Sequence, residues 1–109
     1  MSNLASRSCV PCKGDVPPLA GAELEALAGQ LGESWQVVAG HHLEKEFRFG
    51  NFIDALAFTN RVGELAEAQA HHPDLHLSWG KVRVEIWTHK IDGLTESDFV
   101  WAAKVERLA

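Results

Sequence analysis

The sequence lacks a long apolar run and lacks an excess of positive charge. A helix that crosses a membrane needs about 20 consecutive apolar residues, and polar residues interrupt every apolar stretch here well before that length. The 109 residues include 10 Lys and Arg against 15 Asp and Glu, a net charge of −5, whereas nucleic-acid phosphates select basic surfaces. We therefore expect neither a membrane nor a nucleic-acid partner. The first residues also lack the pattern of a secretory signal, so we expect a cytoplasmic location.

Cysteine is scarce, because the chain contains only Cys9 and Cys12, in the segment Cys-Val-Pro-Cys. A four-cysteine zinc site requires a second pair, and a thioredoxin-like redox motif requires a strand and helix around it. The chain lacks the second pair, and no strand or helix is predicted before this segment. Prolines and small polar residues surround it. We therefore expect residues 1–20 to form a flexible N-terminal tail and residues 21–109 to form a single domain.

Several motifs of cofactor and nucleophile chemistry are also missing. The sequence contains no Gly-x-Gly-x-x-Gly, no Walker phosphate loop, no Gly-x-Ser-x-Gly and no His-Glu-x-x-His. These absences argue against nucleotide-cofactor and serine-nucleophile enzymes.

Hydrophobic periodicity predicts three helices. Leucines at helical spacing indicate a helix over residues 22–31, and a broad apolar face indicates a second helix from a cap at Asn51 to about Gln69. A third helix follows Thr95–Asp98, which resembles a capping box with Asp in place of Glu.

Apolar and polar residues alternate in four further segments, which is typical of half-buried strands. These strands are predicted over residues 35–39, 43–49, 75–79 and 82–88. Residues 40–42 and 80–81 are predicted to connect them as hairpins. The order α-β-β-α-β-β-α predicts an α+β fold, a four-stranded antiparallel sheet with three helices packed on one face. Open sheet edges invite pairing with a second copy, so we expect a homodimer or homotetramer.

Histidines are the residues most suggestive of chemistry. Three of the six, His71, His72 and His76, lie within six positions, and His89 lies one hairpin later. Pro73 disfavours helical geometry at the preceding residue, so the second helix has to end near the histidine pair. Imidazoles titrate near neutral pH and therefore suit proton transfer. Two alternatives remain open on spacing alone, a metal site built from these four histidines and ordinary surface histidines.

Two carboxylates accompany the histidines. Glu67 lies one helical turn before His71, on the same face, and Asp98 lies at the start of the last helix. A carboxylate can fix the tautomer of a neighbouring imidazole. Glu67 is equally consistent with a solvated helix residue, and Asp98 with a simple helix cap.

The remaining histidines and tryptophans have simpler interpretations. His76 points away from its apolar neighbours and is expected to be exposed. His41 and His42 are expected to be hairpin residues, and Trp79 and Trp87 to be packing or interface residues.

Four blocks in order resemble the pterin-4a-carbinolamine dehydratases, and the resemblance covers roughly residues 20–107. The blocks are Glu67-Ala-Gln-Ala-His71-His72-Pro73-Asp74, Trp79-Gly-Lys81-Val82, Thr88-His89 and Gly93-Leu94-Thr95-Glu-Ser-Asp98. The resemblance implies an enzyme that removes water from 4a-hydroxytetrahydropterin to give the quinonoid dihydropterin. It thereby implies recycling of the cofactor of aromatic amino-acid hydroxylases, with a pterin as the small-molecule substrate and with no metal or organic cofactor.

The resemblance also assigns site residues. The family's three histidines fall on His71, His72 and His89, and its supporting acids fall on Glu67 and Asp98. The pocket-lining segments fall on His71–Pro73 and Thr88–Ile91, which adds Pro73, Thr88, Lys90 and Ile91 as substrate-binding residues.

The likeness leaves the division of labour among the histidines as a hypothesis. We expect His71 and His89 to be the acid–base pair and His72 to orient the pterin. Two other functions stay open, a non-catalytic pterin-binding or dimerisation module and an enzyme acting on a molybdopterin-related pterin.

Overall fold

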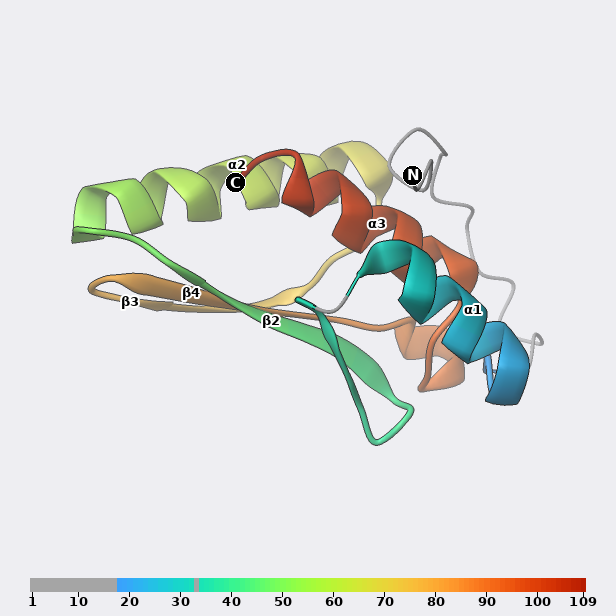
Figure 1. Cartoon of the computed structure of the whole chain (residues 1–109). Helices are drawn as coiled ribbons and strands as arrows, with labels where there is room; N and C mark the ends of the chain where they lie inside the picture. The colour runs from blue at the N-terminus through green and yellow to red at the C-terminus, as the bar shows by residue number, and fades with distance from the viewer. Residues whose placement is uncertain (1–17, 33) are drawn as a thin grey trace.

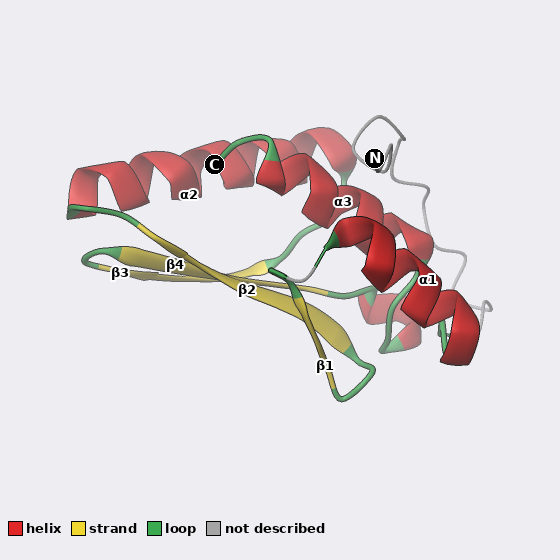
Figure 2. Ribbon diagram, in the orientation of Figure 1, coloured by secondary structure: helices red, strands yellow, loops and turns green. Residues whose placement is uncertain are grey.

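The computed structural model describes residues 18–32 and 34–109, which form one layer of helices over one sheet (Figure 1). The helices are α1 (Gly21–Leu31), α2 (Phe52–Gln69), α3 (Glu96–Glu106) and the short 3-10 helix η2 (His89–Ile91). The strands are β1 (Gln36–Val38), β2 (His42–Arg48), β3 (Asp74–Ser78) and β4 (Lys81–Ile86). Figure 2 shows α1, α2 and α3 on the same side of the sheet, so the predicted α+β fold and element order are confirmed.

The sheet is antiparallel throughout, with the strand order β1-β2-β4-β3. The two hairpins therefore join through their inner strands, where Leu43 pairs with Ile86 and Phe47 pairs with Val82. β1 and β3 are the edge strands. An edge strand leaves one row of backbone hydrogen-bonding groups without a partner strand.

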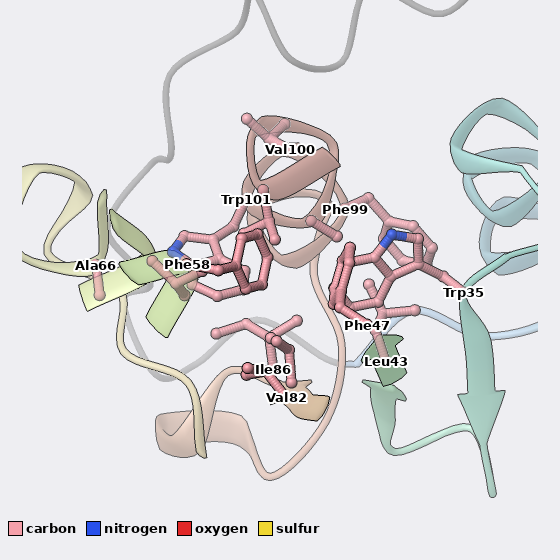
Figure 3. Packing of buried hydrophobic residues seen from close by; sticks show 14 of the residues in the cluster. Trp35, Leu43, Phe47, Phe58, Ala66, Val82, Ile86, Phe99, Val100 and Trp101 are labelled. Carbon is pink, nitrogen blue, oxygen red and sulfur yellow. The ribbon is translucent and has the colours of Figure 1, made fainter. Parts of the chain in front are cut away.

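The core lies between the sheet and the helices (Figure 3). Alternate residues of the inner strands, among them Leu43, Val82 and Ile86, point toward the helices and are fully buried. They meet large side chains from the helices, including Phe58 of α2 and Trp101 of α3, which are also fully buried. Each such side chain contributes roughly 1.5–3 kcal/mol through burial. The alternate residues of the same strands face away from the helices and are mostly polar.

One charged residue, Lys45, lies on the core side of β2 and is neutralised there. Its Nζ forms an ion pair with the carboxylate of Glu106, at the last turn of α3. The indole Nε1 of Trp35 donates to the same carboxylate oxygen at 2.8 Å. The end of α3 is thus tied to the first hairpin.

The hairpin boundaries differ from the prediction by one or two residues. β1 covers Gln36–Val38, and His42 is the first residue of β2 because it pairs with Val38. The connection is therefore residues 39–41, with Ala39 and Gly40 at φ of 53° and 66°, a left-handed conformation that reverses the chain in few residues. His42 was predicted to be in the turn and instead belongs to the strand.

The second hairpin turns earlier than predicted. β3 ends at Ser78, so Trp79 lies in the turn rather than in the strand, and its side chain is 68% exposed. β4 ends at Ile86 rather than at residue 88. Thr88 then forms an isolated bridge with Gly93 around η2.

The helix caps follow the sequence signals. The Asn51 side chain accepts a hydrogen bond from the Asp54 N–H at 2.8 Å, and the Asp98 side chain accepts from the Thr95 N–H at 2.8 Å. α1 has no side-chain cap, as its sequence predicts.

The segment before α1 is described only from residue 18 onward. There the Leu19 N–H donates to the Leu94 carbonyl at 2.8 Å, which anchors the entry to α1. Cys9 and Cys12, and most of the predicted tail, lie outside the described residues. Among the described helices none is long and apolar enough to cross a membrane.

Candidate active site

The end of α2 determines where the histidine pair points. The helix ends at Gln69, and Ala70 follows in a left-handed conformation with φ 52° and ψ 40°. The Ala70 N–H and the His71 N–H bond back to carbonyls of the last turn, as in a C-terminal capping motif. Because a left-handed residue reverses the direction of the chain, His71 leaves the helical path before Pro73 is reached.

The turn at Ala70 places His71 against the first turn of α3. Its Nε2 lies 2.6 Å from Oδ1 of Asp98, although 27 residues separate the two in sequence. The Asp98 side chain is completely buried, and that of His71 is 16% exposed. A buried carboxylate needs several hydrogen-bond donors to offset its desolvation.

Two threonines supply the other donors to Asp98. The Thr88 hydroxyl donates to Oδ2 at 2.8 Å, and the Thr95 N–H donates to the same oxygen at 2.8 Å. The Thr88 and Thr95 hydroxyl oxygens lie 3.0 Å apart. Since the Thr88 hydroxyl hydrogen is given to Asp98, the Thr95 hydroxyl donates to Thr88. Asp98 is therefore both a helix cap and the partner of His71, so the two interpretations of this residue coexist.

This network fixes the tautomer of His71. An ionised carboxylate only accepts hydrogen bonds, so His71 Nε2 carries a hydrogen and donates it to Asp98. In a neutral ring the remaining nitrogen, Nδ1, then has a free lone pair. The arrangement of base and orienting carboxylate is the one that acid–base enzymes use to hold an imidazole as a proton acceptor.

His72 has a different partner and a different environment. Its Nε2 lies 2.5 Å from Oε2 of Glu67, and both side chains are largely exposed, at 59% and 79%. The expected pairing of Glu67 with His71 is therefore wrong. Because Ala70 ends the helical geometry, His71 turns inward to Asp98 and His72 takes the place beside Glu67.

His89 reaches the site from the other side of the Asp98 network. It follows directly after Thr88 and opens η2, so the buried Thr88–Asp98 bond ties its backbone to the partner of His71. The His89 ring packs on the indole of Trp87, with centroids 4.5 Å apart and planes at 35°. His71 and His89 are thus held by one continuous set of contacts, whereas His72 stands on the exposed end of α2.

Residues 17–108 match the family model described as pterin 4 alpha carbinolamine dehydratase. The chain belongs to this family. A protein of Rubrobacter xylanophilus is 65% identical over 108 residues, which cover 99% of this chain and 100% of that protein. One from Alkaliphilus metalliredigens is 55% identical over 107 residues, covering 98% of this chain and 96% of that protein. Both carry the provisional name pterin-4-alpha-carbinolamine dehydratase.

Two solved structures resemble this family member in fold. A Brucella melitensis protein, described as a transcriptional coactivator/pterin dehydratase, aligns with TM-score 0.76 and 28% identity, covering 84% of this chain and 98% of that one. A pterin dehydratase-like protein, described as a RuBisCO assembly factor of the alpha-carboxysome, aligns with TM-score 0.61 and 25% identity. It covers 72% of this chain and 93% of that one.

The other residues assigned by the family pattern gather around the same loop. Thr88 is buried within the Asp98 network, Lys90 is exposed, and Ile91 is partly buried in η2. Pro73 is partly buried between α2 and β3. The sequence pattern did not single out Thr95 as a hydrogen-bonding member of the network, nor Trp87 as the surface on which His89 packs. The position of Trp87, two residues before His89 on one strand face, is the signal that could have indicated the latter.

The alternative of a metal site built from the four candidate histidines is not supported by the geometry. Within the described ranges, one group of three or more donor side chains has metal-site spacing, and it consists of His42, Glu44 and Glu85. His71 and His72 instead face separate carboxylates, and His76 lies 2.9 Å from Glu85 on the exposed face of the sheet. The expected exposure of His76 is confirmed, with 49% of its side chain accessible.

Proposed function

We propose that the protein is a dehydratase that converts 4a-hydroxytetrahydropterin to the quinonoid dihydropterin and water. The observation that supports this most strongly is the buried Asp98–His71 pair, which leaves His71 Nδ1 as a proton acceptor beside the loop that carries His89. Family membership supplies the substrate class. Recycling of the cofactor of aromatic amino-acid hydroxylases follows as the proposed biological role, in the cytoplasm.

The reaction requires two proton transfers. The C4a–O bond breaks and the hydroxyl leaves as water after it receives a proton, while N5 loses its hydrogen and forms a double bond to C4a. One imidazole must therefore be a base and the other an acid. We assign the base to His71, since Asp98 occupies its Nε2 hydrogen, and the acid to His89.

His72 has a binding role in this proposal. Its exposed ring, held by Glu67, suits hydrogen bonding to the heteroatoms of a pterin rather than proton transfer in a desolvated environment. Pro73, Lys90 and Ile91 would complete the contacts with the substrate, as the family pattern implies.

A stopped-flow assay of 4a-hydroxytetrahydropterin dehydration tests the activity directly. We expect the purified protein to accelerate the reaction well above buffer, because two positioned proton-transfer groups contribute about 10²–10⁴-fold each. The measurement is the rate of quinonoid dihydropterin formation as enzyme concentration rises, between pH 5 and 9. A rate that stays at the buffer value at every pH would exclude a dehydratase.

Other roles named for the structural relatives provide no better account of this site. Coactivation and RuBisCO assembly are described for those two proteins and require no paired histidine and buried carboxylate. A dehydratase-like reaction on a molybdopterin-related pterin would use the same proton transfers, and the stopped-flow assay with each pterin distinguishes the two substrates.

We also propose that the protein is a homodimer or homotetramer. β1 and β3 are open edges of the sheet, and α2 exposes the large apolar side chains of Phe52, Ile53 and Leu56 at 42%, 75% and 38%. Such groups are commonly covered by another copy. Sedimentation equilibrium is expected to give a mass at least twice that of one chain, and a monomer at micromolar concentration would contradict the proposal.

A further inference from the structure

A second cluster of donor side chains lies on the face of the sheet that the helices do not cover. His42 and Glu44 of β2 and Glu85 of β4 each offer one ligand atom, and these atoms all lie within 4.8 Å of one another. Glu44 and Glu85 are directly paired across the two inner strands. Like charges at such a position destabilise a sheet unless something positive lies between them.

Hydrogen bonds behind the cluster determine which nitrogen of His42 faces the carboxylates. His41 Nε2 lies 2.7 Å from Oδ1 of Asp92, and His41 Nδ1 lies 3.1 Å from His42 Nδ1. An ionised carboxylate can only accept, so His41 Nε2 carries the hydrogen and His41 Nδ1 accepts. The hydrogen between the two rings therefore belongs to His42 Nδ1. In a neutral ring this leaves His42 Nε2 as a lone-pair donor.

Nothing in the cluster donates a hydrogen bond into its centre. His42 Nε2 is 3.7 Å from Oε1 of Glu44 and 3.8 Å from Oε1 of Glu85, too far for a direct hydrogen bond. The other oxygen of Glu85, Oε2, is already engaged by Arg83 Nε at 3.1 Å and by His76 Nε2 at 2.9 Å. Oε1 of Glu85 is thereby left pointing at the imidazole.

The three lone-pair atoms have the spacing that a tetrahedral metal requires. Nitrogen and oxygen ligands about 2.0–2.2 Å from zinc lie roughly 3.4 Å from one another. The distances of 3.7 and 3.8 Å need to shorten by only a few tenths of an ångström. A ligating histidine typically gives its other ring hydrogen to a polar neighbour, and His42 gives it to His41.

We propose that His42, Glu44 and Glu85 form a binding site for a divalent transition cation of the zinc class, with water at the fourth position. One imidazole and two carboxylates select zinc or cobalt over magnesium and calcium, which prefer all-oxygen sites. The site is separate from His71 and Asp98. It contacts the active-site loop through Asp92 and through Trp87, whose indole centroid is 5.2 Å from His41, 5.8 Å from His42 and 4.5 Å from His89.

Isothermal titration of zinc sulfate into the full-length, untagged, chelator-treated protein tests the site. The titration is run in a Cys9→Ser/Cys12→Ser background, so that thiols cannot account for binding. We expect one zinc ion per chain, not displaced by millimolar magnesium. We expect cobalt at the same site to give the intense visible absorption of tetrahedral coordination. Neither readout depends on dehydratase activity, so this proposal and the proposed function fail independently.

Single variants locate the bound ion. His42→Ala and Glu85→Gln should each weaken zinc binding at least about tenfold, since each removes one of three ligands. Glu46→Gln is the matched control. Glu46 lies on the same strand and face as Glu44, but its carboxylate is 2.7 Å from Arg48 and 3.7 Å from Lys81, and its loss should leave zinc affinity unchanged. Circular dichroism checks that each variant is folded. Absence of binding in the parent protein, or parental affinity in folded Glu85→Gln, would overturn the proposal.

Discussion

Replacing His71 with alanine is expected to lower kcat for dehydration by about 10²–10⁴-fold, with a much smaller change in KM. The imidazole whose Nε2 hydrogen is given to buried Asp98 presents Nδ1 as the base, and no neighbouring side chain in the Asp98 network can replace it. Replacing His72 with alanine should instead raise KM, with a smaller loss in kcat, because the exposed ring beside Glu67 is assigned to binding. Steady-state kinetics from stopped-flow traces separate these two effects.

His76→Ala is the matched control for the histidine series. It removes an imidazole that is 49% exposed on the opposite face of the sheet, so kcat and KM for dehydration should stay at the parent values. Thermal unfolding of each variant shows whether a lost rate reflects lost structure. If His72→Ala loses far more kcat than His71→Ala, then His72 is the proton-transfer residue and our assignment of roles is reversed.

Replacing Asp98 is expected to have the largest combined effect on stability and rate. Asp98→Ala removes the acceptor of Thr88, of the Thr95 N–H and of His71, and a buried donor left without a partner costs about 1–3 kcal/mol. Loss of the α3 cap is part of the same change. We therefore expect the free energy of unfolding to fall by roughly 2–4 kcal/mol, measured by urea denaturation.

Asp98→Asn separates the electrostatic part from the structural part. Asparagine keeps the shape and one acceptor oxygen, so the loss of stability should be smaller than in the alanine variant. An amide NH₂ that faces His71 Nε2 would favour the tautomer with the hydrogen on Nδ1, and this removes the lone pair of the base. We expect kcat to fall by about 10²–10⁴-fold while the fold persists. A folded Asp98→Asn variant with the parent kcat would show that Asp98 does not set the state of His71.

The fold could be predicted from local patterns, whereas the contacts of the site could not. Asn51 and Thr95–Asp98 carry cap signals, and the alternation in the strands fixes which face is buried, so the order of elements and the layer of helices are confirmed. The turns were misplaced by a residue, because Ala39 adopts a left-handed conformation that alanine seldom takes and that the sequence does not signal.

The same difficulty accounts for the misassigned carboxylate. Helical spacing pairs Glu67 with His71 only if the helix continues, and it ends instead with a left-handed Ala70. The partner that His71 does have, Asp98, comes from an element 27 residues later, and that contact depends on how α3 packs across the end of α2. Family resemblance named all three residues, but the pairing required the three-dimensional arrangement.

The carboxylate of Asp98 begins α3 and holds His71 at the same time, so local opening of that helix and loss of the oriented base are a single event. Fraying of the first turn of α3 withdraws the acceptor from Thr88 and Thr95 and frees the imidazole to rotate. The site therefore has no separate equilibrium of its own. Its population of competent molecules is set by the cooperativity of the helix start, and a substitution that merely weakens that first turn reduces activity without touching any group that meets the substrate.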